Sequence, residues 1–153
     1  MKGSPADIKT AALKLLSYRA RSRKEMAEKL QLKGFESGQI EGVITLLETA
    51  GLINDRALAA DLLRYSVERK FLGKKGIRVF LARRGIDRDL INKTLASHAP
   101  EAEEHAALEF AERKIETLKK YPREVVKRRL WGMLQRRGFS SEVVHKTINA
   151  VLT

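Results

Sequence analysis

Three copies of one short motif constrain the fold of this 153-residue chain more than any other feature of its sequence. Each copy reads Leu-x-x-x-Gly followed by Phe or Ile. The copies are Leu30, Gly34 and Phe35, then Leu81, Gly85 and Ile86, then Leu134, Gly138 and Phe139. The glycines lie 51 and 53 residues apart. A period near fifty residues predicts one structural unit that is used three times.

The residue types of the motif are those of a helix end. If Gly34 takes the left-handed position that follows a helix, Leu30 and Phe35 are the two residues that touch in a Schellman ending. A good N-cap residue follows each glycine, one residue later in the first copy than in the others, at Ser37, Asp87 and Ser140. We therefore predict a helix, a tight turn and a second helix in every unit, with structural turns at Gly34, Gly85 and Gly138. Such a turn can be scaffold only, or it can contact a partner.

Apolar residues at helical spacing predict nine helices, and the absence of sustained alternation predicts that there is no sheet. We expect helices to begin after Ser4 and Ser22, and the first helix of the second unit to run on to Phe71. Gly73 and Gly76 are expected to break or bend the chain. The predicted fold is all-α: three tandem three-helix repeats, at 1–53, 54–98 and 99–153, in an elongated rod that can be curved.

Charge points to the class of partner. Thirty-one Lys and Arg residues against 19 Asp and Glu residues give a net charge of +12, which favours polyanions, and nucleic acid first. The excess is uneven, because 64–88 holds nine basic residues against two acids and 113–137 holds ten against two. The segments 36–61 and 99–112 are acidic. We expect the contact surface on the basic faces of the helices within 23–33, 74–84 and 123–137.

Arginine pairs just before the second and third glycines are the strongest candidates, and Leu32 and Lys33 replace the pair in the first copy. Cations in a last helical turn also offset the helix dipole, which explains a part of the pattern only. The predicted contact residues are Arg19, Arg21, Arg23, Lys24, Lys74, Lys75, Arg78, Arg83, Arg84, Lys127, Arg128, Arg129, Arg136 and Arg137.

Catalytic chemistry has little support in the sequence. The histidines are scattered, a solvated acidic face explains the surroundings of His98 and His105, and we expect no metal and no cofactor. The chain has no Cys, and hence no disulfide or thiolate zinc site. Gly73-Lys74-Lys75-Gly76 matches the G-x-x-G loop of KH domains, but a flexible joint between helices is the plainer interpretation. Trp131 is expected to pack, although stacking on a partner is the alternative.

Three segments together form a recognisable pattern. The first is Leu16-Ser17-Tyr18-Arg19-Ala20-Arg21-Ser22 with Glu25 and Leu30. The second is Gly51-Leu52-Ile53-Asn54-Asp55 with Ala59, and the third is Arg136-Arg137-Gly138-Phe139-Ser140. In this order and spacing, which carry the specificity, they resemble the RecX family of regulatory proteins, and the resemblance covers about residues 12 to 152.

The resemblance implies a bacterial, cytoplasmic, non-enzymatic modulator of the RecA recombinase. The resemblance implies a fold of tandem three-helix repeats. It also implies inhibition of the RecA–DNA filament, including its ATPase and co-protease activities. We therefore expect two partners, a RecA-type filament and single- or double-stranded DNA. We also expect a monomer, and no membrane segment, because no apolar run approaches the ~18 residues that a membrane span requires. The alternative is a helix-turn-helix protein that binds duplex DNA directly.

Overall fold

Nine α-helices and no strand make up residues 3–153, which the structure, a computed structural model, describes. Met1 and Lys2, assigned above to the first unit, lie outside the described residues. The helices are α1 (Pro5–Tyr18), α2 (Arg23–Leu32), α3 (Ser37–Thr49), α4 (Asp55–Glu68), α5 (Lys74–Arg83), α6 (Arg88–Ala96), α7 (Pro100–Leu118), α8 (Arg123–Arg136) and α9 (Ser141–Leu152). The all-α prediction is confirmed.

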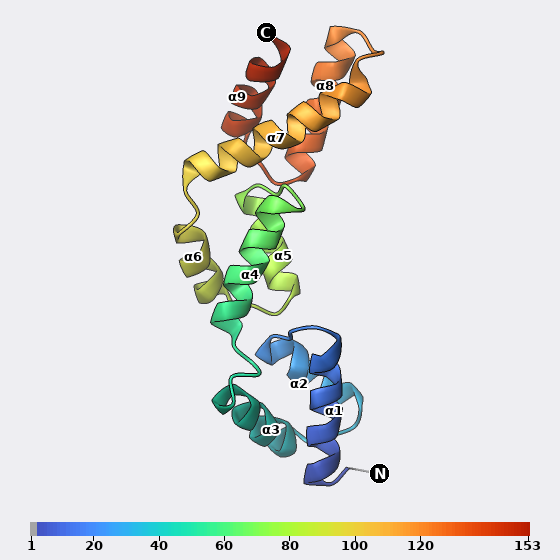
Figure 1. Cartoon of the computed structure of the whole chain (residues 1–153), viewed down its shortest axis with the longest axis vertical. Helices are drawn as coiled ribbons and strands as arrows, with labels where there is room; N and C mark the ends of the chain where they lie inside the picture. The colour runs from blue at the N-terminus through green and yellow to red at the C-terminus, as the bar shows by residue number, and fades with distance from the viewer. Residues whose placement is uncertain (1–2) are drawn as a thin grey trace.

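The helices group in threes along one long axis (Figure 1). We call α1–α3 unit 1, α4–α6 unit 2 and α7–α9 unit 3, and each triplet packs around its own apolar cluster. Apolar residues at equivalent positions before and after the three glycines lie in these clusters. Among them, Met26, Ile77 and Leu130 each stand eight residues before a glycine and are fully buried. One core residue crosses between units, because Phe71 packs in the cluster of unit 3. We propose that the chain passes from one unit to the next at two short linkers, between residues 53 and 54 and between residues 98 and 99.

The predicted glycine turns are confirmed. Gly34, Gly85 and Gly138 have φ of +94°, +80° and +90°, which only glycine adopts without strain. In the first copy the Phe35 N–H donates to Leu30 O (3.3 Å) and the Gly34 N–H donates to Gln31 O (2.9 Å), the pair of bonds that defines a Schellman ending. The same two bonds recur at the other copies.

One predicted cap was wrong. Asp87 and Ser140 cap α6 and α9 as expected, but Ser37 is the first residue of α3 and Glu36 is its cap. The backbone N–H of Glu36 donates to Gln39 Oε1 (3.4 Å). All three caps therefore lie two residues after their glycine and all three helices begin one residue later, because the geometry of the turn and not the best capping side chain sets where the next helix starts.

Two further predictions about unit 2 were wrong. Helix α4 ends at Glu68 and does not reach Phe71, whose φ of +52° is the one left-handed non-glycine backbone among the described residues. Gly73 does interrupt the chain as predicted, because it caps α5, but Gly76 does not, because it lies in the first turn of that helix. Both glycines pack against the backbone of unit 3.

The contact between units 2 and 3, which we call joint 2–3, is a backbone contact. The end of α8 meets the start of α5: the Gly73 N–H donates to Arg137 O (2.9 Å) and the Lys75 N–H to Gly138 O (3.3 Å). A Cβ on Gly138 would fall on the backbone of Gly76. Carbonyl groups at the end of α8, which have no partner in their own helix, thus accept hydrogen bonds from unpaired N–H groups at the start of α5. The dipoles of the two helices align head to tail.

The contact between units 1 and 2, joint 1–2, has the same arrangement but is made by side chains. The Gly85 turn at the end of α5 packs on Ser22 at the start of α2. The Arg84 guanidinium reaches across to Glu25 Oε2 (Nε, 3.0 Å) and to Ala20 O (Nη2, 2.9 Å). Helices α8, α5 and α2 therefore follow one another end to end: the end of α8 closes the N-terminus of α5, and the end of α5 closes the N-terminus of α2.

An acid at the start of a unit completes both joints. Asp55 Oδ1 accepts from the Arg23 N–H (2.9 Å), and Glu103 Oε2 accepts from the Lys74 N–H (2.7 Å). In each case the first helix of one unit supplies a carboxylate to the first N–H of the second helix of the preceding unit, where the helix dipole favours negative charge. Burial raises the pKa of Asp55, and the hydrogen bond from Arg23 opposes that rise.

Candidate nucleic-acid interface

The two arginine pairs divide into an inner and an outer residue. Arg84 and Arg137, the second of each pair, lie at the helix caps and reach back toward the preceding unit. The side chain of Arg84 is 15% exposed and pairs with Glu25, which is 12% exposed. Arg137 Nη1 donates to Lys70 O (2.5 Å), and its guanidinium lies 4.7 Å from the Phe110 ring centroid. Both inner arginines therefore stabilise the joints between units.

The outer residues, Arg83 and Arg136, are exposed and line one cleft. This cleft, which we call the α5–α8 cleft, has a volume of about 430 Å³ and lies where the end of α8 meets α5. Lys75, Val79 and Arg83 follow at intervals of four residues, so they share one face of α5. The full lining is Lys70, Leu72, Lys75, Gly76, Val79, Phe80, Arg83, Gln135, Arg136 and Gly138.

The lining holds four cations and no carboxylate. Within the part of the chain that the structure describes, none of Lys70, Lys75, Arg83 and Arg136 forms an ion pair with an acidic side chain. Four unneutralised positive charges around one hollow produce a local potential that attracts polyanions. The arrangement suits consecutive phosphates of a nucleic-acid backbone, which basic side chains bind largely without regard to sequence.

One aromatic residue, Phe80, lines the cleft, and Tyr65 packs against it from outside the lining. The ring of Phe80 lies 6.2 Å from that of Tyr65 on α4, with an interplanar angle of 29°, and Lys70 Nζ lies 5.3 Å from the Phe80 centroid. Tyr65 is 51% exposed. Aromatic faces beside free cations are the combination with which proteins hold unpaired bases.

The predicted contact residues of unit 1 are mostly engaged inside that unit. Arg21 is buried and its Nε donates to Leu15 O (3.3 Å). Arg19 pairs with Glu25, and Arg23 pairs with both Glu41 and Glu48. Lys24 is exposed. Within residues 3–53, the predicted contact residues thus bring no group of free cations together comparable with that of the cleft.

The remaining predicted residues are exposed but lie outside the cleft. Lys74 faces a neighbouring hollow with Lys75, Glu103 and Ser140. Arg78 donates to Asn92 Oδ1 (2.6 Å). On α8, Lys127 and Arg128 are exposed, and Arg129 stacks on Tyr121 with its guanidinium 4.2 Å from the ring centroid. Of the fourteen predicted contacts, the cleft unites three: Lys75, Arg83 and Arg136.

Several cleft residues were not predicted. Lys70 and Gln135 lie inside the basic segments 64–88 and 113–137, but neither belongs to the arginine pairs that precede the glycines. Phe80 was not selected as a contact residue, and it is only partly buried against the core of unit 2. Its position between Val79 and Arg83 on a basic helix was the available signal, since an aromatic residue among cations is typical of a nucleic-acid surface.

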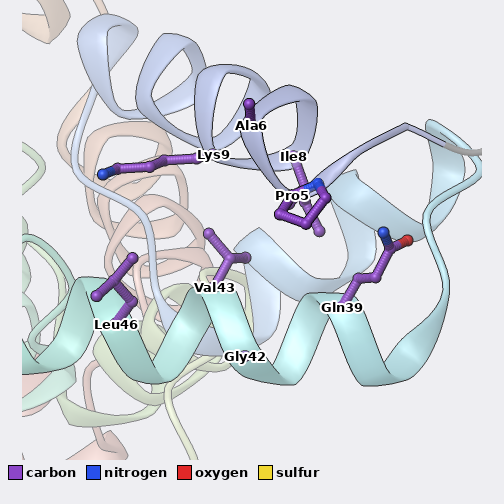
Figure 2. Close-up of a pocket in the computed structure, with 8 residues that line it drawn as sticks. All are labelled: Pro5, Ala6, Ile8, Lys9, Gln39, Gly42, Val43 and Leu46. Atoms are coloured by element: carbon purple, nitrogen blue, oxygen red, sulfur yellow. The ribbon is translucent and has the colours of Figure 1, made fainter.

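The histidines and the apolar groove between α1 and α3 offer no alternative chemistry. His98 and Glu103 are buried, so the solvated face predicted around them is wrong in its inner part, where the joint covers both residues. Among residues 3–153 no cluster of three potential metal ligands occurs. An apolar groove of about 460 Å³ runs between α1 and α3, where Pro5 and Ala6 face Val43 and Leu46 (Figure 2). Lys9 is the one charged residue in its lining.

Trp131 packs in unit 3, as expected, and its ring meets that of His145 edge to face at 5.0 Å. Over the described residues, every helix is too short or too polar to span a bilayer.

The comparisons with known proteins agree in one family. Residues 9–47 match the family model of the first three-helix domain of RecX, and residues 101–148 match the model of the third three-helix domain. The regulatory protein RecX of Mycolicibacterium smegmatis is 32% identical over 94% of this chain and 79% of its own length. That of Clostridioides difficile is 29% identical over 94% of this chain and 68% of its own length.

Solved structures show the same fold. The crystal structure of RecX from Lactobacillus salivarius superposes with a TM-score of 0.83 over 96% of both chains at 24% identity. A second RecX crystal structure has a TM-score of 0.82 over 95% of this chain and 73% of the other, at 25% identity. With two of the three domain models matched and relatives above 30% identity over most of their length, this chain belongs to the RecX family of regulatory proteins.

Proposed function

We propose that this protein is a non-enzymatic regulator, active as a cytoplasmic monomer, that binds a RecA–DNA filament and inhibits its recombinase, ATPase and co-protease activities during DNA repair and the SOS response. The observation that carries the proposal is the α5–α8 cleft, which holds four cations and no acid. Membership of the RecX family supports the choice of partner.

The three-unit rod supports binding to a repeating partner. Units 1, 2 and 3 succeed one another along the long axis of the molecule (Figure 1), so separate units can contact successive subunits of a filament. Contacts that are individually weak then combine through multivalency. We assign phosphate contact to the exposed arginines Arg83 and Arg136 with Lys75, and a role in holding the joints to Arg84 and Arg137.

Direct helix-turn-helix binding to duplex DNA is less well supported. A recognition helix contacts bases with its N-terminal residues. In each unit the second helix of the helix-turn-helix is α3, α6 or α9, and acids lie at its N-terminus: Glu36, Asp87 with Asp89, or Glu142. Acidic side chains at the end that reads bases repel the DNA phosphates, so none of the three units favours binding in the major groove.

The test is the ATPase activity of a RecA-type recombinase on single-stranded DNA, with and without this protein. We expect inhibition near stoichiometric amounts, and weaker inhibition by a variant in which Lys75, Arg83 and Arg136 are replaced by Ala. The matched control replaces Lys9, Lys14 and Lys29, three basic residues of unit 1, and should inhibit as the parent does. Unaltered ATPase activity with the parent protein would overturn the proposal.

A further inference from the structure

We propose that the α5–α8 cleft binds a single nucleic-acid strand, with a base stacked on the Tyr65–Phe80 pair and the flanking phosphates held by Lys75, Arg83 and Arg136. The inference rests on the proposed function and deepens it, because it distinguishes an unpaired strand from duplex DNA and from the protein of a filament as the direct ligand of this cleft.

The first step is the aromatic wall. Phe80 lines the cleft, and the ring of Tyr65 is stacked against it. Tyr65 is one of the large side chains that folding leaves exposed, at 51%. Folding alone does not require an exposed tyrosine there. A base stacked on this pair adds favourable contact for every base type, because each base presents a π face.

The second step is the position of the cations relative to that wall. Lys70 Nζ lies over the Phe80 ring, and Lys75, Arg83 and Arg136 line the same hollow from two helices. A strand with its base on the aromatic pair therefore has positive charge beside its sugar-phosphate backbone. In a duplex the base faces are stacked on their neighbours and cannot reach a protein ring, so the aromatic wall contributes only to a single strand.

The third step is the contrast with the corresponding surface of joint 1–2. Aligning the glycines Gly34 and Gly85 places Glu28 at the position of Val79, Lys29 at that of Phe80 and Leu32 at that of Arg83. That surface has no aromatic residue and includes acids. The single-strand site is thus confined to joint 2–3, although both joints share one architecture.

The experiment measures binding of a fluorescent oligo-dT strand, without recombinase, to the full-length protein and to Tyr65→Ala and Phe80→Leu variants. Loss of one stacked base should weaken binding about 5- to 150-fold, the equivalent of 1–3 kcal/mol. The dependence of affinity on salt should not change, because no phosphate contact is removed. Arg83→Ala should instead reduce the log–log salt slope by about 0.7.

Two controls make the result specific. An abasic strand with the same number of phosphates should bind the parent and the Tyr65→Ala variant equally. Tyr18→Ala removes an exposed tyrosine of unit 1, 71% exposed, and should leave oligo-dT binding unchanged. Phe80 is partly buried, so Tyr65→Ala, at an exposed position, keeps the test valid if the Phe80 variant is unstable.

Equal weakening on the abasic strand, or no weakening on oligo-dT, would overturn the inference. Either result leaves the proposed function open to its own test, because inhibition of a recombinase filament is measured separately. Conversely, specific stacking on oligo-dT together with an unaffected recombinase would retain the strand-binding site and reject the regulatory role.

Discussion

Joints 1–2 and 2–3 have the same arrangement of helices, but side chains hold the first and backbone contacts hold the second. In both, the glycine turn of one unit closes the N-terminus of the second helix of the preceding unit. At joint 1–2 the third residue of the covered helix, α2, is Glu25, and its carboxylate forms an ion pair with Arg84 of the next unit. At joint 2–3 the equivalent position is Gly76, and the backbone of the next unit lies directly on it. One side-chain contact has thus been exchanged for one close backbone approach.

The exchange has a consequence for function. A joint made by side chains uses its charges internally: Glu25 Oε2 accepts from Arg19 and Arg84, and Glu25 Oε1 from the Ser22 N–H. A joint made by backbone leaves its cations unneutralised. The basic cleft therefore lies at the joint whose own cohesion does not need the positive charge of Lys75, Arg83 and Arg136.

The largest expected effect is that of Gly138→Ala. The variant must place a Cβ in the left-handed region, which costs roughly 1–2 kcal/mol, and on the backbone of Gly76. Overpacking of this kind adds typically about 1–3 kcal/mol. Gly34→Ala is the matched control: its φ is +94° but nothing lies within 4 Å of the added carbon. Denaturant unfolding should show that Gly138→Ala loses clearly more stability than Gly34→Ala. Equal losses would mean that joint 2–3 is not packed as described.

A smaller effect is expected at joint 1–2 for Arg84→Ala. The variant removes the bonds to Glu25 and Ala20 O, and hydrogen bonds to charged groups contribute about 1.5–3 kcal/mol. Because the pair keeps some exposure, we expect a loss in unfolding free energy near the lower figure. The adjacent exposed Arg83 provides the control, and its Ala variant should stay within about 0.5 kcal/mol of the parent. A double-mutant cycle with Glu25→Gln measures the coupling, and a coupling of zero would remove Arg84 from the joint.

The sequence predicted the units better than the joints. The left-handed backbone could be predicted locally at Gly34, Gly85 and Gly138, because only glycine adopts it freely. The helix ends follow from that backbone conformation. The role of Arg84 is different in kind. Arg83 and Arg84 are the same residue type at adjacent positions, and only the position of Glu25, 59 residues earlier, decides which of them turns inward.

The α5–α8 cleft was predicted in part for the same reason. Basic segments and arginine pairs selected Lys75, Arg83 and Arg136, but also Arg21 and Arg137, which the fold uses internally. Gly76 was interpreted as a hinge, because its reason for being glycine is a residue of another unit. Contacts between units have no local signal in the sequence, whereas contacts within a unit repeat and can be recognised.

The smallest expected effect concerns pH and the residue that precedes each new unit. Ile53 at joint 1–2 and His98 at joint 2–3 both stand just before the cap of the next first helix, and both are buried. Burial lowers the pKa of His98, with Lys74 acting in the same direction and Glu103 against it. The Nε2 atom of His98 has no hydrogen-bond partner among the described residues.

A lowered pKa means that the unfolded chain takes up a proton at His98 more readily than the folded protein does. The stability that neutral His98 contributes is therefore complete above the usual histidine pKa of about 6.5 and falls as the pH drops below it. We expect the thermal midpoint to fall less between about pH 7.5 and about pH 5.5 in His98→Ile, which copies joint 1–2, than in the parent. Both proteins keep the two exposed histidines, His105 and His145. An identical fall in both would show that joint 2–3 gains no pH dependence from its histidine, and that the two joints differ in packing alone.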